Sequence, residues 1–173
     1  MRASQAGTKM DSFDRAILTL IQADGSLPLN EIASRVGLSP TPCWNRIRKM
    51  EESGIIAKRV ALLDAAKLAL GVTIYVSIET SDHSEGWLAR FADAVRDMPE
   101  VVDVYRMSGD VDYMMRVVVP GIDAYDDFYR RLIKAVPLKN VTSRFAMEKI
   151  KATTALPLEQ SPVFKARKKT LKA

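Results

Sequence analysis

The sequence is poor in the residues on which most enzymes and metal proteins depend. Its 173 residues include one cysteine, Cys43, and one histidine, His83. One cysteine cannot form an internal disulfide, and a lone Cys and a lone His cannot hold zinc. The chain also lacks a glycine-rich phosphate loop and any Ser/His/Asp or Cys/His set. We therefore predict no metal, no cofactor and no catalytic residue, a packed Cys43, a surface His83 and a protein that is not an enzyme.

Long apolar runs are missing as well. No stretch approaches the ~20 apolar residues that a membrane-spanning helix needs. Together with the single thiol, this favours a reduced, cytoplasmic setting and no membrane partner. Hydrophobic residues still make up 47% of the chain, which is enough for a core. The formal net charge of +5 favours a polyanionic partner.

The first clear pattern along the sequence is helical periodicity. Apolar residues recur at three- and four-residue spacings from Ser12, and "ADGS" at 23–26 ends this first helix. Pro28 starts a short second helix that Gly37 ends. A third helix begins sharply, because Ser39 is a good N-cap and a proline at position 40 suits a first turn. This succession predicts a helix-turn-helix of the winged type, with an extended strand at 55–64.

The third helix has a polar, basic face that suits the major groove of duplex DNA. Its predicted DNA contacts are Ser39, Thr41, Trp44, Asn45, Arg46, Arg48 and Lys49. Arg48 can read guanine and Asn45 adenine, whereas Arg46 and Lys49 suit phosphate. Without further context, such a face is simply a solvated surface.

The second half of the chain predicts a β-α-β-β-α-β order. Clean alternation marks a strand at 71–80, and two β-rich runs around "SGDV" mark a hairpin. Apolar stripes at 87–95 and 122–132 predict helices with core-facing sides, and 141–151 predicts the last strand. This is the ferredoxin-like arrangement, so the fold class is α+β. Two helices cover one face of such a sheet, and the open face calls for a second copy, hence a homodimer.

The resulting boundaries divide the chain into five parts. We predict a flexible arm at 1–10, a DNA-binding domain at 11–62, a linker at 63–70, a ligand-binding and dimerisation domain at 71–152 and a basic tail at 153–173.

Two separate motifs resemble the Lrp/AsnC (feast/famine) family of transcription regulators. The run "LNEIASRVGLSPTPCWNRIRKMEESGII" is similar to the family's helix-turn-helix, and "MSGDVDYMMRVVV" followed by "AYDDFY" is similar to its effector-binding domain. The resemblance implies dimers that assemble into a higher oligomer, an octamer in many members. It also implies a small amino-acid effector bound between dimers. Segments such as "CWNR" resemble a subgroup linked to sulfur amino acids.

The same resemblance implies where the effector binds, near the hairpin turn and the last strand. An amino-acid ligand needs a partner for its ammonium and another for its carboxylate. The residues that suit these tasks are Ser108, Gly109, Asp110, Asp112, Thr142, Ser143 and Arg144. Composition alone explains the first four as an ordinary hairpin turn. The alternative function is an architectural protein that binds DNA with little sequence preference, and a DNA-free amino-acid sensor is disfavoured by the intact helix-turn-helix.

Overall fold

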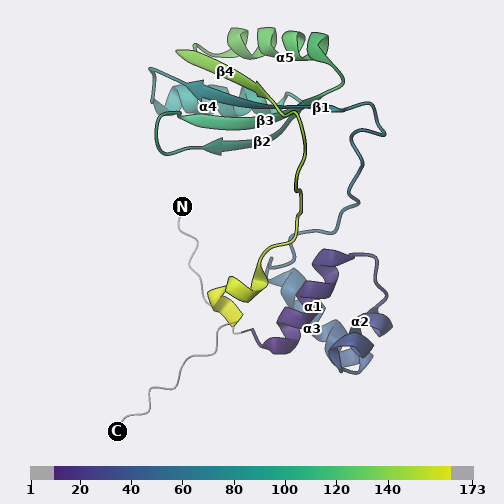
Figure 1. Ribbon diagram of the computed structural model, residues 1–173. Coiled ribbons are helices and arrows are strands. Elements are labelled where there is room, and N and C mark those ends of the chain that lie inside the picture. The colour runs from purple at the N-terminus through teal and green to yellow at the C-terminus, as the bar shows by residue number, and fades with distance from the viewer. Residues whose placement is uncertain (1–9, 165–173) are drawn as a thin grey trace. The chain divides into compact units, whose positions relative to one another are not determined.

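The computed structural model of the protein describes residues 10–164, and the chain forms two compact units (Figure 1). One unit takes in the described residues up to Ala61 and those from Ala152 onward, and the other is Leu62–Lys151. Most of the predicted arm at 1–10 and the basic end of the predicted tail lie outside the described residues.

The first unit contains the predicted helix-turn-helix. Its helices are α1 (Ser12–Ala23), α2 (Leu29–Val36) and α3 (Pro40–Glu52). The turn between α2 and α3 passes through Gly37, whose φ of +73° lies in the left-handed region that glycine tolerates best. The three helices enclose one small core, made of Met10, Ile17, Ile21, Ile32, Ala33, Cys43, Ile47 and Met50.

The extended strand expected at 55–64 is not formed. These residues have no strand assignment, and Val60, Leu62 and Leu63 are exposed. A β-strand needs a neighbour to accept and donate its backbone hydrogen bonds, and no other part of the described chain pairs with this segment. The prediction of a sheet strand at this position is therefore wrong.

The second unit is the predicted ferredoxin-like domain. Its elements are β1 (Val72–Glu79), α4 (Glu85–Arg96), β2 (Val101–Arg106), β3 (Tyr113–Val119), α5 (Ile122–Ala135) and β4 (Asn140–Phe145). The sheet has the order β2-β3-β1-β4, with every neighbouring pair antiparallel. The last strand ends at Phe145, six residues before the predicted end at 151. Phe145 pairs with Ile74, and the Ala146 N–H still donates to the Thr73 carbonyl. Because β1 begins at Val72, the residues from Glu148 onward have no backbone of β1 to pair with.

One face of this sheet packs against α4 and α5. The core includes Trp87 and Phe91 from α4, Phe128 and Leu132 from α5, and alternate residues of β1 and β3. The predicted stripes are therefore core, except that Leu88 is 37% and Ile122 is 71% exposed. Leu88 follows Trp87 by one residue, which turns it about 100° around the helix and away from the sheet.

The other face of the sheet has no covering helix within the described chain. Tyr75 and Tyr105 are exposed there, at 45% and 61%. Between them, Arg116 Nε donates to Asp103 Oδ2 over 2.6 Å. Exposed tyrosines around polar pairs are typical of surfaces that bind another protein.

After Ala152 the chain returns to the first unit, a feature that the sequence did not predict. Residues 156–164, here called the C-terminal strap, contain two short 3-10 helices, Leu158–Gln160 and Pro162–Phe164. Gln22 of α1 donates to and accepts from the backbone of Leu156, over 3.1 and 3.0 Å. Arg15 of α1 pairs with Glu159 over 2.6 Å. The strap therefore lies along α1.

Candidate DNA-binding helix and effector site

Helix α3 has one buried side and one exposed side. Cys43, Ile47 and Met50 recur at helical spacing and face the core, where burial raises the pKa of the Cys43 thiol above its ordinary value. The exposed side presents the predicted DNA contacts Thr41, Trp44, Asn45, Arg48 and Lys49. Ser39 occupies the N-cap position with extended backbone, but its side chain makes no capping hydrogen bond.

Three exposed side chains form a row along α3. The Arg48 guanidinium lies 5.3 Å from the centre of the Trp44 ring, within cation–π distance. Arg48 Nε also donates to Glu52 Oε1 over 2.7 Å. The guanidinium thus contacts both neighbours along the helix, and its hydrogen bond to Glu52 uses Nε rather than a terminal nitrogen. Glu52 was not among the predicted residues, although its spacing of four from Arg48 is the signal of a helical ion pair.

Arg46 lies in a different environment from the other predicted DNA contacts. Its guanidinium is 2.9 Å from Asp11 and 2.7 Å from Asp14, and 5.5 Å from the centre of the Phe13 ring. Asp11 and Asp14 form the capping box at the start of α1. Arg46 therefore joins α3 to the N-terminal end of α1, and its charge is already balanced by two carboxylates.

We expect Arg46→Met to destabilise the free protein by roughly 1–2 kcal/mol at pH 7, because a half-buried charged network loses its cation. Burial by itself raises the pKa of Asp11, but hydrogen bonds from the Asp14 N–H and from Arg46 outweigh it and hold the pKa below its ordinary 3.8. The stabilisation is present above that value and is lost as the pH falls through the lower pKa of the folded state. Urea unfolding at pH 7 and below pH 3.8 measures both effects.

Arg35→Met is the matched control, since Arg35 forms an exposed pair with Glu31 within α2. We expect Arg35→Met to lower the free energy of unfolding by less than about 0.5 kcal/mol. If Arg46→Met cost no more than this control, the network would not stabilise the unit.

The predicted effector residues of the hairpin surround a well-bonded turn. Gly109 has a φ of +122°, which other residues rarely adopt. Met107 N–H donates to the Asp112 carbonyl over 2.8 Å, and Asp112 Oδ2 accepts from Thr80 N–H over 2.8 Å. His83 Nδ1 lies 3.9 Å from the other carboxylate oxygen of Asp112. Ser108, Gly109 and Asp110 are exposed at the tip.

The three predicted residues of β4 are divided between the two faces of the sheet. Ser143 faces the helices and shares a hydrogen bond with the Tyr125 hydroxyl, whose pKa is raised by burial. Thr142 and Arg144 face the open side, where Arg144 Nη1 donates to the buried Ser77 Oγ over 2.6 Å. Tyr125 was missed from the sequence, because nothing in its local pattern reveals a partner 18 residues away.

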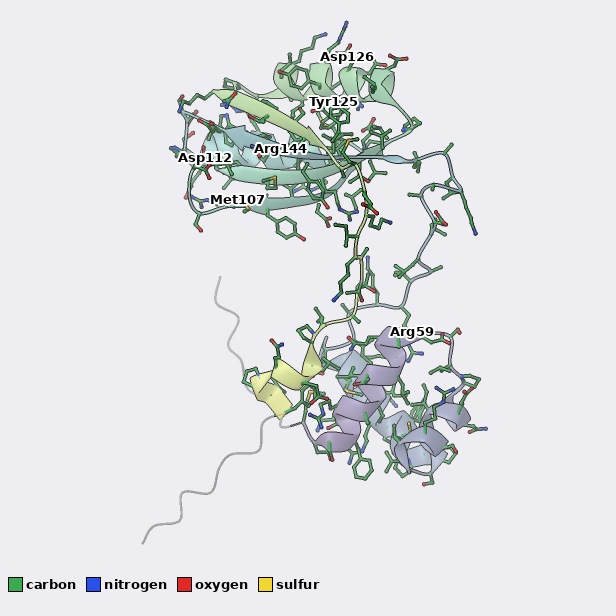
Figure 2. The ribbon with its side chains drawn as sticks, viewed as in Figure 1. Arg59, Met107, Asp112, Tyr125, Asp126 and Arg144 are labelled. Carbon is green, nitrogen blue, oxygen red and sulfur yellow. The ribbon has the colours of Figure 1, made fainter. Side chains whose placement is uncertain are left out.

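Asp112 and Arg144 occupy separate positions along the sheet (Figure 2). Asp112 is bonded to Thr80 just after β1, whereas Arg144 lies opposite Tyr75, near the middle of β1. The Arg144 side chain reaches back to Ser77 Oγ, so three residues of extended strand, roughly 10 Å, separate the two charged groups. The ammonium and carboxylate of a free amino acid are much closer together than that, so a single chain does not bring both charged groups to one such ligand.

A helix-turn-helix with an exposed basic helix, joined to an α+β unit with an open sheet face, defines a DNA-binding regulator with a separate regulatory domain. Sequence models agree with this class. Residues 10–57 match a winged helix-turn-helix DNA-binding domain, and residues 73–156 match the Lrp/AsnC ligand binding domain. The chain belongs to the Lrp/AsnC family and is a sequence-specific, DNA-binding transcription regulator.

Relatives and solved structures support this assignment. The DNA-binding transcriptional activator DecR of Escherichia coli strain K12 is 49% identical over 151 residues, 87% of this chain and 99% of DecR. The crystal structure of an AsnC family regulator from Agrobacterium tumefaciens is 57% identical, with a TM-score of 0.84, and covers 87% of this chain and 98% of its own. A regulator from Neisseria meningitidis in complex with L-Met is 30% identical, with a TM-score of 0.83, and covers 87% and 97%.

Two further findings concern residues 10–164 alone. No helix there is long and apolar enough to cross a membrane. No group of three His, Cys, Asp or Glu side chains there is arranged to hold a metal ion.

Proposed function

We propose that this regulator responds to a small amino acid bound between copies of the chain, and that it has no catalytic activity. The observation that carries the proposal is the similarity, over most of both chains, to a solved regulator in complex with L-Met. That similarity favours methionine and other sulfur amino acids as the first effectors to test.

In this proposal α3 enters the major groove. Arg48 reads guanine with its terminal nitrogens, Asn45 reads adenine, and Trp44 lies against sugar or thymine methyl groups. Ser39, Thr41 and Lys49 bind phosphates and set the position of the helix. Arg46 contributes by holding α3 against α1, because its guanidinium is bonded to Asp11 and Asp14.

The effector site is completed by two copies of the chain. Asp112 supplies a carboxylate for the ligand ammonium, with Ser108, Gly109 and Asp110 around it. Arg144 and Thr142 serve a ligand carboxylate from another copy, since a single chain holds Asp112 and Arg144 too far apart. Ser143 supports this strand by its bond to Tyr125.

The open sheet face is the proposed dimer surface. A second copy would cover Tyr75, Tyr105 and the Arg116–Asp103 pair, which the helices leave exposed. Dimers then assemble further, into an octamer in this proposal. Effector binding between dimers changes the spacing of the DNA-binding units and so the sites that they occupy together. Light scattering with and without effector measures this assembly, and the octamer requires eight chains per particle.

The effector is tested by thermal unfolding of the full chain against single amino acids, including methionine, cysteine and leucine. A ligand at 100 times its Kd stabilises the native state by about 2.7 kcal/mol, so the melting temperature must rise. We expect Asp112→Asn to weaken the affinity for the effector about tenfold or more, because the ligand ammonium loses its carboxylate. The rise in melting temperature at a given effector concentration should be correspondingly smaller. The asparagine oxygen can still accept the Thr80 N–H, so the turn should survive.

Asp126→Asn is the control for this test. Asp126 is an exposed residue of α5 that pairs with Arg130 (Figure 2). We expect the Asp126→Asn variant to show the same rise in melting temperature with effector as the parent chain. If no amino acid raised the melting temperature or altered the assembly, the amino-acid effector would be wrong. If Asp112→Asn responded fully, the site would lie elsewhere.

A further inference from the structure

Two polar side chains of the second unit are buried. Within residues 10–164, the buried polar residues are Ser77 and Thr80, which are 4% and 5% exposed. Burying a hydroxyl group costs free energy unless its hydrogen bonds are satisfied, so a buried serine or threonine needs partners. Ser77 is bonded to Arg144, and Thr80 is bonded to Asp112, the two charged residues of the candidate effector site (Figure 2).

Ser77 holds one end of the Arg144 side chain. It lies on the open face of the sheet near the end of β1, where its neighbours across the strands are Met114 and Thr142. Arg144 Nη1 donates to Ser77 Oγ over 2.6 Å, and the Ser77 hydroxyl donates to Met114 Sδ over 3.7 Å. Sulfur is a weak acceptor, so the bond from the charged guanidinium is the stronger of the two. A hydroxyl fixes the guanidinium without neutralising it, so the charge stays available for an anion.

Thr80 holds Asp112 in a similar way, through its backbone. The Thr80 N–H donates to Asp112 Oδ2 over 2.8 Å. The Thr80 hydroxyl donates to the Asp82 carbonyl and accepts from the Asp82 N–H, each over 3.1 Å. This pair of bonds fixes the backbone just after β1 and, with it, the N–H that binds the Asp112 carboxylate.

We propose that Ser77 and Thr80 are positioning residues of the effector site. Ser77 orders the Arg144 guanidinium for a ligand carboxylate, and Thr80 orders the Asp112 carboxylate for a ligand ammonium. The two residues are three positions apart at one end of β1, so this strand sets the spacing between the charged groups. The proposal rests on the proposed amino-acid effector and adds the residues through which its charged partners act.

The physical reason is conformational entropy. A free arginine side chain has many rotamers, and a ligand that binds it must select one of them. Because Ser77 selects the Arg144 conformation beforehand, less entropy is lost when the carboxylate binds. We expect this ordering to raise the affinity for the effector about 2- to 10-fold.

A double-mutant cycle tests whether Ser77 acts through Arg144. The full-length chain is titrated with L-methionine by calorimetry, and L-cysteine and L-leucine are the further probes. We expect Ser77→Ala to lower the affinity about 2- to 10-fold and Arg144→Gln to lower it about tenfold or more. In the Arg144→Gln chain, Ser77→Ala should change the affinity less than about twofold, because no guanidinium remains to be ordered. Ser77→Thr keeps the hydroxyl and should bind as the parent does.

The same cycle applies to Thr80 and Asp112. Thr80→Val has nearly the same shape but loses both bonds to Asp82. We expect it to lower the affinity at least about twofold in the parent chain and by less than that in the Asp112→Asn chain. Thr80→Ser keeps the hydroxyl and should restore binding.

Thr73→Ala is the matched control. Thr73 lies on the same face of β1 and pairs with Val118, away from both charged groups, so we expect the affinity of the parent. Thermal unfolding without effector identifies any variant that misfolds, and light scattering measures its assembly.

Equal losses from Ser77→Ala in the parent and in the Arg144→Gln chain would overturn the proposal, because the loss would then be a general effect on the sheet. Disrupted assembly of Ser77→Ala without effector would also overturn it, because Ser77 would then belong to the dimer surface. Failure of the proposed function gives a different result. None of the three amino acids would then bind the parent chain, and the positioning role would be lost with it.

Discussion

Replacing Arg48 with alanine is expected to weaken DNA binding by roughly 5- to 150-fold on a duplex that the full chain has enriched from a random pool, here called the enriched duplex. This is the range for one bidentate contact between arginine and guanine. The structure favours the upper part of that range. Trp44 and Glu52 already hold the guanidinium, so less side-chain entropy is lost when the base is bound. Affinity for random duplex should change far less. Fluorescence anisotropy on both duplexes at one salt concentration measures the ratio.

Lys49→Ala is the matched comparison, because Lys49 is a neighbouring exposed cation of the same helix. We expect Lys49→Ala to weaken binding to both duplexes by a similar factor. It should also reduce the slope of log affinity against log salt by about 1, as removal of a phosphate-binding cation does. Equal behaviour of the two variants would mean that Arg48 does not read a base. Full retention of binding by a chain with both substitutions would remove α3 as the DNA-binding helix.

Replacing Trp87 with alanine is expected to destabilise the second unit by about 3–5 kcal/mol, the range for deletion of a fully buried aromatic side chain. Trp87 is 0% exposed and stacks on Phe91 with ring centres 5.1 Å apart. Its Nε1 donates to the Pro137 carbonyl over 2.9 Å, so the substitution also leaves a carbonyl without its donor. Urea unfolding followed by circular dichroism measures the loss.

Leu88→Ala provides the control on the same helix. Leu88 is 37% exposed and lies off the core-facing side of α4, so we expect it to cost less than about 1 kcal/mol. The chain has two tryptophans, and in Trp87→Ala only Trp44 remains to report on the first unit by fluorescence. If Trp87→Ala unfolded with the parent midpoint, the aromatic cluster would not be the centre of this core.

Much of the fold could be predicted from the sequence because its local signals agree with one another. The apolar spacing of α1, the proline start of α3 and the alternation of β1 each predict the element that is observed. The prediction failed where a strand depends on a partner. Residues 55–64 have an extended pattern but no strand of the described chain beside them. Strand β4 ends at Phe145, opposite Ile74, close to the start of its partner β1 at Val72. Pairing is a property of two segments, and a local pattern describes only one of them.

The candidate site was also predicted only where local patterns determine it. The exposed side of α3 follows from helical periodicity, and the turn at Gly109 follows from the demand for a positive φ. Sequence reasoning expected both Arg46 and Arg48 to contact DNA, yet Arg46 is bonded to α1, whereas Arg48 is exposed and bonded within its own helix. It also grouped Ser143 with Arg144, which face opposite sides of the sheet.

The sequence by itself determined the helix-turn-helix, the ferredoxin-like order of elements and the family, because these follow from periodicity, turn residues and motifs that operate over a few residues. Only the tertiary structure decided which cations remain available on α3, how far apart Asp112 and Arg144 lie, and that residues 156–164 return to α1. Each of these depends on contacts between segments far apart in the chain. Such contacts form only when the whole unit folds, and no short stretch of sequence encodes them.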